Sequence, residues 1–193
     1  MIAIIDYGSG NVNSVKKALD YLGESSIITS DSKEILDADK VVFPGVGNFG
    51  DVMKELRKRK LDTIIKKIIN KKIPFLGICV GLQVLFEESE ESPEIKGLGI
   101  FKGKVKKFTR GKIPQIGWNE ITSKSIGNGY VYFVDSYYAV PDDKNIIEST
   151  SDYYGKFVAA VKKDNVLATQ FHPEKSGEFG LEILRKWLRQ AKA

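Results

Sequence analysis

The chain has 193 residues, of which 42% are hydrophobic and 28% charged, a balance that is typical of globular proteins and excludes a disordered or fibrous chain. The formal net charge is +5, and the lysines are spread along the sequence, which favours a solvated surface over a nucleic-acid interface. The length fits a single domain that spans residues 1–193.

Strand and helix patterns alternate in the first half of the chain. Apolar or β-branched runs predict four strands, over residues 2–5, 26–29, 41–43 and 75–78. Helical spacing of apolar residues predicts helices over 12–22, with Gly23 as the C-cap, and over 49–56, 61–68 and 80–88. This alternation indicates parallel strands with helices on both faces of the sheet.

The second half has a different pattern. Short strand candidates separated by Gly, Asp and Asn turns cover residues 104–109, 115–121, 130–133, 156–161 and 167–171. A last helix is predicted from about Ser176, with leucines and a tryptophan on one face. The sequence therefore predicts an α/β fold: a mostly parallel central sheet flanked by helices, with antiparallel additions in the second half.

Membrane and metal sites are not expected. No secretion signal is recognisable, and the longest apolar stretch, 73–86, is too short and too interrupted to span a bilayer, so we expect a soluble cytoplasmic protein. The chain has one cysteine, Cys79, and one histidine, His172. An intrachain disulfide is therefore impossible, and a zinc site built from Cys and His alone would lack ligands.

Cys79 lies in the most informative segment, Gly77-Ile78-Cys79-Val80-Gly81. An apolar strand leads into Cys79 and an apolar helix follows it, the arrangement of the strand–nucleophile–helix turn of Gly-x-Ser-x-Gly hydrolases, with Cys in place of Ser. Glycines two residues before and after the nucleophile allow the close packing that this strained turn requires. A lone cysteine is more often a core residue, but the two glycines and the strand–helix switch favour a nucleophile.

His172 lies in the segment Gln170-Phe171-His172-Pro173-Glu174, at the end of a predicted strand. Ligand-facing loops of α/β sheets lie at such strand ends, and Glu174 is placed to orient the imidazole. Cys, His and Glu together form a constellation typical of acyl transfer.

Two glycine-containing loops follow predicted strands. Pro44-Gly45-Val46-Gly47 could turn backbone N–H groups toward an oxyanion, or could be a simple tight turn. The segment from Gly8 to Asn13 begins like a dinucleotide fingerprint but lacks the third glycine, so a loop at a partner interface is the better interpretation.

These segments resemble the class I (triad) glutamine amidotransferases, whose two signature segments match residues 77–83 and 172–174. More narrowly, the chain resembles the glutaminase subunits of imidazole glycerol phosphate synthase. Three further segments carry this finer match, residues 6–11, 44–47 and 117–119, and the resemblance extends over nearly the whole chain.

The resemblance implies a reaction and no cofactor. Cys79 would attack the side-chain amide of glutamine, and His172, oriented by Glu174, would protonate the departing ammonia and then activate water. N–H groups at Val80 and in the segment Gly45, Val46 and Gly47 would hold the oxyanion. Ammonia would pass to a (β/α)₈ barrel cyclase subunit, which makes imidazole glycerol phosphate and an aminoimidazole carboxamide ribotide in histidine biosynthesis.

The resemblance also implies binding residues. Positions that contact glutamine match Gln83, Glu91, Ser136 and Tyr137. Positions near the partner interface match Asn11, Trp118, Asn119 and Lys175. The chain departs from many relatives at Gln115 and Asp135, where those relatives have His.

Three other interpretations remain at this level. The chain could be the glutaminase of another pathway, such as pyridoxal phosphate synthase. It could also be an elbow-type cysteine hydrolase that acts alone on esters or peptides. In the third, a flavodoxin-like binding module, Cys79 would be an unreactive core residue.

Overall fold

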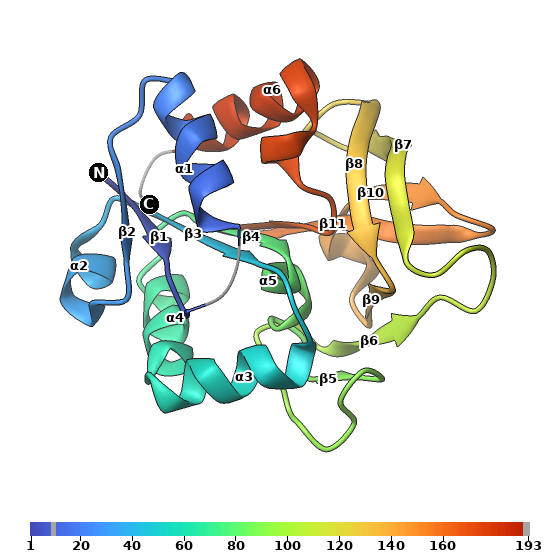
Figure 1. Ribbon diagram of the computed structural model, residues 1–193, viewed down its shortest axis with the longest axis horizontal. Coiled ribbons are helices and arrows are strands. Elements are labelled where there is room, and N and C mark those ends of the chain that lie inside the picture. The colour runs from blue at the N-terminus through green and yellow to red at the C-terminus, as the bar shows by residue number, and fades with distance from the viewer. Residues whose placement is uncertain (9–10, 191–193) are drawn as a thin grey trace.

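Five parallel strands form one half of a large sheet in the computed structural model, which describes residues 1–8 and 11–190 (Figure 1). All four pairings between these neighbours are parallel. In sheet order the strands are β2 (Ser26–Thr29), β1 (Ile2–Ile5), β3 (Lys40–Gly45), β4 (Phe75–Cys79) and β12 (Val166–Thr169).

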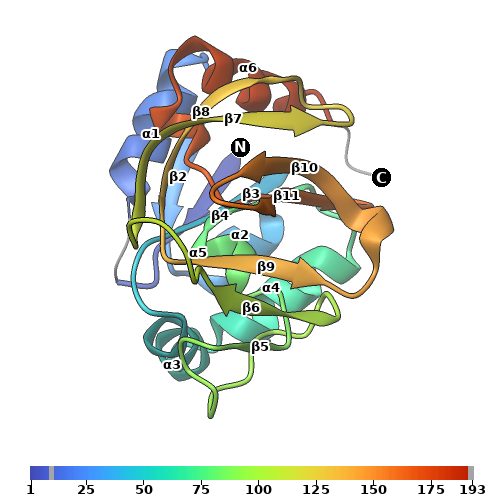
Figure 2. The ribbon, with the colours of Figure 1, turned by 90° about the vertical axis from the view of Figure 1, so that its right-hand side faces the viewer.

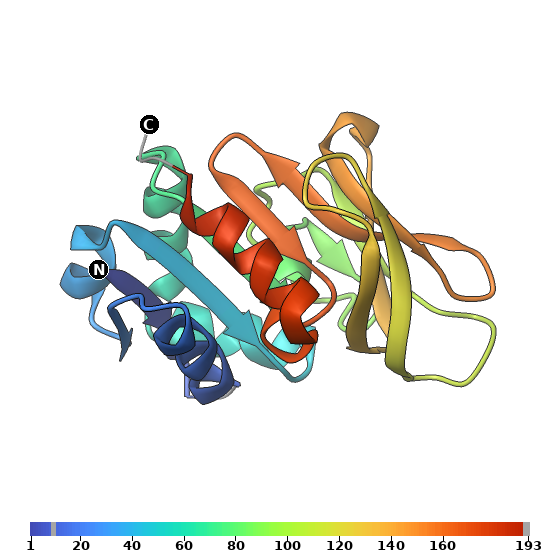
Figure 3. The same ribbon diagram turned by 90° about the horizontal axis from the view of Figure 1, so that it is seen from above.

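Helices cover both faces of this parallel half, as the alternation predicts. On β1, Ile2 and Ile4 join one buried cluster, with residues of two of the helices, and Ala3 and Ile5 join the other. The first face is covered by α1 (Val12–Tyr21) and α6 (Gly177–Leu188), which cross it side by side in the view from above (Figure 3). The second is covered by α2 (Ser32–Asp37), α3 (Phe49–Lys58) and α4 (Leu61–Asn70) (Figure 1). None of the described helices is long and apolar enough to cross a membrane.

The second half of the chain extends the sheet with antiparallel strands (Figure 2). Beyond β12 the order continues through β11 (Lys156–Lys163), β10 (Ile147–Asp152), β7 (Gln115–Ser123) and β8 (Gly129–Asp135). A branch pairs β9 (Tyr137–Pro141) with β11 and with β6 (Gly103–Lys107), which pairs with the two-residue β5 (Glu88–Ser89). The described residues also contain two 3₁₀ turns, Lys144–Ile146 and Pro173–Lys175.

The predicted fold class is confirmed, with local corrections. The helix expected over 80–88 ends at Gln83, because α5 spans only Val80–Gln83. Beyond it the backbone bonds elsewhere: Leu98 N–H donates to the carbonyl of Val84, and Gly97 N–H to that of Glu87. The strand expected over 167–171 is β12, which pairs parallel with β4 as well as antiparallel with β11. Helix α2 and strands β5, β9 and β10 were not predicted, and Glu88 of β5 falls in the range predicted as helix.

Candidate active site

Cys79 ends β4 and directly precedes α5, at a sharp turn. Its φ is 56°, in the region that favours glycine, so the backbone is strained there. A Cβ at Gly77 would lie 2.6 Å from the Gly81 carbonyl oxygen, and one at Gly81 would lie 2.2 Å from the Phe43 carbonyl oxygen. The packing therefore requires both glycines, and the structure has the elbow that the sequence predicts.

The thiol of Cys79 is largely buried, with 8% of the residue exposed. Its Sγ lies 4.0 Å from the Val134 carbonyl oxygen and accepts a contact of 3.7 Å from the Gln170 side-chain amide. Residues of two other strand ends, β8 and β12, therefore enclose the sulfur.

His172 and Glu174 form a buried pair in the turn that follows β12. The imidazole Nδ1 lies 2.8 Å from Oε1 of Glu174, and the two side chains are 2% and 0% exposed. The backbone fixes this turn, because His172 N–H donates to the carbonyl of Tyr132 on β8. Asn11 donates a second hydrogen bond of 3.0 Å to the same carboxylate oxygen. The structure thus brings the predicted Cys, His and Glu together from β4 and from the turn after β12.

The charge state of His172 follows from its partners. Burial lowers the pKa of His172, but hydrogen bonding and the charges of Cys79 and Glu174 outweigh it and raise that pKa to about 10. An imidazolium at neutral pH can share charge with a thiolate and donate a proton to a leaving group. Asp135 shows the opposite environment: burial raises the pKa of this carboxyl well above its ordinary value, and the charge of His172 offsets only part of the effect.

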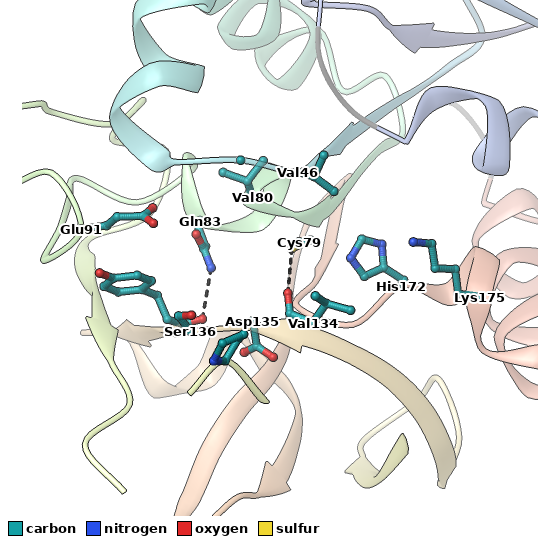
Figure 4. A pocket seen from close by; sticks show the side chains of 13 residues that line it. Val46, Cys79, Val80, Gln83, Glu91, Val134, Asp135, Ser136, His172 and Lys175 are labelled. Carbon is teal, nitrogen blue, oxygen red and sulfur yellow. Dashed lines mark hydrogen bonds between the residues drawn. The ribbon is translucent and has the colours of Figure 1, made fainter. Parts of the chain in front are cut away.

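One cavity of about 280 Å³ joins the predicted residues (Figure 4). Cys79 lies between Gln83 and Glu91 on one side and His172 and Lys175 on the other. The lining residues that the sequence singled out are Val46, Gly47, Cys79, Val80, Gln83, Glu91, Ser136, Tyr137, His172 and Lys175. Among the residues described, no group of three His, Cys, Asp or Glu side chains is placed to hold a metal ion.

The substrate-binding candidates are held by specific contacts. Gln83 donates from Nε2 to the Tyr137 carbonyl and to Oε1 of Gln170, both at 3.1 Å. Glu91 accepts a 2.7 Å hydrogen bond from the N–H of Phe49, at the start of α3. An amide and a carboxylate therefore occupy one side of the cavity, with the thiol between them and His172.

The proposed oxyanion residues differ in how they are held. Val80 opens α5 and lines the cavity, and Gly45 packs so tightly that a Cβ there would lie 2.1 Å from a Val80 methyl carbon. Val46 is exposed, and its backbone is bonded to Tyr7: the Tyr7 hydroxyl accepts from Val46 N–H at 3.2 Å and donates to the Val46 carbonyl at 2.9 Å. The N–H of Val46 is therefore committed to Tyr7 here.

The interface candidates separate into two groups. Asn11 and Lys175 lie at the active site, one on Glu174 and one in the cavity wall. Trp118 and Asn119 lie outside the cavity on β7, where Asn119 donates to the Asp152 carbonyl at 2.7 Å. Trp118 belongs to a set of exposed apolar side chains on β7 and β8, which are Ile116, Trp118, Tyr130 and Val134. Ser9 and Gly10, within the glycine loop that precedes α1, lie outside the described residues.

Sequence reasoning assigned no role to Gln170 and noted Asp135 only as a departure from the His of many relatives, although both residues face the site. Gln170 is fully buried between Cys79 and Gln83, and Asp135 lines the cavity. A signal for Gln170 was present, since a polar residue ends an apolar strand two positions before His172. No local pattern distinguishes Asp135, because its burial comes from neighbours that are distant in sequence.

Comparisons with known proteins identify the family of the chain. The sequence profile of the family "Glutamine amidotransferase class-I" matches residues 3–191. The chain is 52% identical to the imidazole glycerol phosphate synthase subunit HisH of Pyrococcus furiosus, over 97% of this chain and 98% of that protein. It is 48% identical to subunit HisH 1 of Methanococcus maripaludis, with the same coverage.

Solved structures support the fold alone, because their sequence identities are low. A crystal structure of a glutamine amidotransferase superposes with a TM-score of 0.81 at 18% identity, covering 97% of both chains. PurLQS from Thermotoga maritima superposes with a TM-score of 0.77 at 19% identity, covering 97% of this chain and 96% of that chain. The elbow, the profile match and the full-length relatives lead to one assignment: the chain belongs to the class-I glutamine amidotransferases and, within them, to the family of the HisH subunit of imidazole glycerol phosphate synthase.

Proposed function

We propose that the chain is the glutaminase subunit of imidazole glycerol phosphate synthase and hydrolyses glutamine to glutamate and ammonia with Cys79 as nucleophile. The observation that carries the proposal is the elbow cysteine, which shares one cavity with the buried His172–Glu174 pair. Relatives of 48% and 52% identity bear the name of this subunit over nearly their full length. The chain would act as one domain in the cytoplasm and would need no cofactor.

The reaction begins with the Cys79 thiolate attacking the side-chain amide carbon of glutamine. The raised pKa of His172, about 10, supplies an imidazolium that donates a proton to the amide nitrogen. Ammonia leaves, and a γ-glutamyl thioester remains on Cys79. His172, now neutral, takes a proton from water, whose oxygen attacks the thioester. Glutamate and the thiolate are released, and Glu174 keeps the imidazole oriented throughout.

The tetrahedral oxyanion needs hydrogen-bond donors at the elbow. The N–H of Val80, at the start of α5, is one candidate. The other candidates are the backbone N–H groups of Gly45, which ends β3, and of Val46 and Gly47, which follow it in the cavity wall. Since Val46 N–H bonds to Tyr7, that peptide must turn before it can contribute.

Glutamine recognition fits the polar side of the cavity. Glu91 presents a carboxylate that can pair with the α-ammonium group of the substrate, and Gln83 presents an amide between Glu91 and Cys79 (Figure 4). Ser136 and Tyr137, at the start of β9, complete this wall. The side-chain amide of glutamine would then reach the thiol.

The partner is the cyclase subunit, a (β/α)₈ barrel that uses the ammonia. Ammonia must arrive unprotonated, because ammonium has no lone pair, so the cavity must open directly onto the partner. Such a surface is offered by the exposed apolar side chains on β7 and β8, which include Trp118. One of them, Val134, is also part of the cavity wall. Asn11, Asn119 and Lys175 would contribute polar contacts at this interface.

Glutamate release from glutamine tests the proposal directly. We expect weak release by the chain alone and a strong increase when the cyclase and its nucleotide ligand are added. Cys79→Ala should abolish release while folding and cyclase binding remain intact. Absence of release with a reactive Cys79 would favour a stand-alone hydrolase, and an unreactive Cys79 would favour a binding module.

A further inference from the structure

Gln170 is a buried amide between the nucleophile and the proposed substrate pocket. It follows β12 directly and has no exposed surface. Its Nε2 lies 3.7 Å from Cys79 Sγ, and its Oε1 accepts from Gln83 Nε2 at 3.1 Å. Its backbone N–H donates to the Ala159 carbonyl on β11 at 2.8 Å, which fixes the side chain's origin in the sheet.

A backbone carbonyl determines which way this amide points. The Gln83 side chain lies 3.1 Å from the carbonyl of Tyr137, and a carbonyl only accepts, so the nearby Gln83 atom is the donor Nε2. The same Nε2 also bonds to Gln170, so the facing atom of Gln170 must be the acceptor Oε1. The N–H₂ end of Gln170 therefore points at the sulfur of Cys79.

We propose that Gln170 is a catalytic residue of the Cys79 site, whose Nε2–H donates to Sγ and stabilises the thiolate that attacks the substrate. The proposal rests on the nucleophile role of Cys79. A thiol can donate to the Val134 carbonyl 4.0 Å away, but that carbonyl repels a thiolate. The donors that face Sγ among the described residues are His172 and Gln170.

These two donors have different tasks in the cycle. His172 loses its proton to ammonia, so for part of the reaction it no longer stabilises the sulfur as a cation. Gln170 cannot titrate and keeps its N–H on Sγ when the thioester breaks and the thiolate returns. Because Oε1 of the same side chain bonds to Gln83, Gln170 also fixes the position of the Gln83 amide relative to the sulfur.

The test measures the thiol itself, without needing glutamine turnover. Iodoacetamide alkylation of Cys79 is followed from pH 5 to 10 in the wild-type chain, Gln170→Met and Gln170→Glu, each bound to the cyclase. Met keeps the size and removes the donor, and Glu keeps the shape and presents an acceptor. We expect the pH midpoint of alkylation to move upward by about one unit in Gln170→Met and further in Gln170→Glu. The kcat for glutamate release should fall at least tenfold in both.

Gln83→Met is the matched control. It removes the hydrogen bond to Oε1 but leaves the donor on the sulfur, so KM for glutamine should rise while the alkylation midpoint stays near that of the wild type. The other titratable groups near the sulfur and His172 are Glu174 and four residues of the cavity wall, Asp135, Lys175, Glu91 and Tyr137, and none of these variants changes them.

An unchanged alkylation midpoint in Gln170→Met overturns the proposal and leaves Gln170 as a packing residue. If Gln170→Met unfolds, Gln170→Leu, which also removes the donor without adding a charge, decides by the same criterion. If the Gln170 variants show the predicted alkylation shifts but the wild-type complex releases no glutamate, the proposed function is refuted and the thiolate donor stands.

Discussion

The two sides of the proposed oxyanion site are built very differently. On one side, the elbow at Cys79 is enclosed by backbone: Gly77 and Gly81 have no room for a Cβ, and all of α5 is buried. On the other, Val46 and Gly47 are exposed, and a Cβ at Gly47 would have no neighbour within 4 Å. The Tyr7 hydroxyl hydrogen-bonds to the backbone of Val46 at both its N–H and its carbonyl, which belong to two successive peptide groups.

This difference indicates that the Cys79 elbow is rigid and that the segment at Val46 can change conformation when a partner binds. A strained nucleophile persists only where the surrounding packing over-determines it, which holds at Cys79. A backbone segment held through one side chain is more stable than its alternative conformations by about 2 kcal/mol, the contribution of two hydrogen bonds. A docked partner can supply free energy of that size. The elbow is therefore expected to be the same in all states, and the Val46 peptide to be the part that changes.

Removing the acid–base group should have the largest effect on activity. We expect His172→Ala to lower kcat of the cyclase complex by roughly 10⁵-fold or more, since it loses both the proton donor and the thiolate partner. Glu174→Ala should be less damaging, by about 10²–10⁴-fold, because in the proposed mechanism Glu174 orients the imidazole without carrying the proton. Steady-state kinetics at saturating glutamine decide the order. A Glu174 variant worse than the His172 variant would contradict these roles.

Alanine at the two kinds of glycine tests the contrast in packing. Gly81→Ala would place a Cβ 2.2 Å from the Phe43 carbonyl oxygen, and we expect it to destabilise the fold by about 3 kcal/mol. Gly47→Ala meets no atom and strains only the backbone, whose φ is 116°, so about 1 kcal/mol is expected. Urea unfolding of both variants gives the comparison, and equal losses would mean that the elbow is not tightly packed.

The elbow could be predicted because its requirements are local. A strand, two glycines around Cys79 and a following helix all lie within a few residues, and their steric needs can be inferred from residue type. The parallel half of the sheet followed from the same short-range alternation. His172 and Glu174 could be added because they end one strand and are close in sequence.

The remaining features depend on contacts between distant segments. The end of α5 at Gln83 is set by hydrogen bonds from residues 97 and 98 to the carbonyls of residues 84 and 87. Tyr7 and Val46 are 39 positions apart, and Gln170 and Cys79 are 91 positions apart. No periodicity in one sequence encodes such pairs, so the state of the oxyanion peptide and the donor on the sulfur required the structure.

Releasing the backbone of Val46 should change activity less than His172→Ala or Glu174→Ala does, and it should raise activity. Tyr7→Phe removes both hydrogen bonds to Val46, so the peptide can reach the oxyanion orientation without a partner. We expect glutamate release by the isolated chain to rise roughly 5–30-fold, the factor that about 1–2 kcal/mol provides. The rate in the cyclase complex should change much less. Wild-type activity of the isolated variant would show that Tyr7 does not restrain this segment.

The smallest expected effect concerns Asp135, a buried residue of the cavity wall that can be compared with His172. His172 is paired with Glu174, whereas both carboxyl oxygens of Asp135 are buried without a hydrogen bond among the described residues. Because burial raises its pKa, Asp135 contributes stability below about pH 4, where it is protonated in both states, and this contribution is lost as the pH rises through the folded-state pKa.

Asp135→Asn removes the titration while nearly keeping the shape. We expect the variant to melt about 2–4 °C above the wild type at pH 7–8, as about 1 kcal/mol does in a domain of this size. The difference should shrink toward pH 4, because the wild-type carboxyl is then neutral. Thermal melts of both proteins across this pH range measure the difference in melting temperature, and His172 is present in both. A variant less stable than the wild type at pH 8 would mean that the Asp135 carboxylate has partners that stabilise its charge.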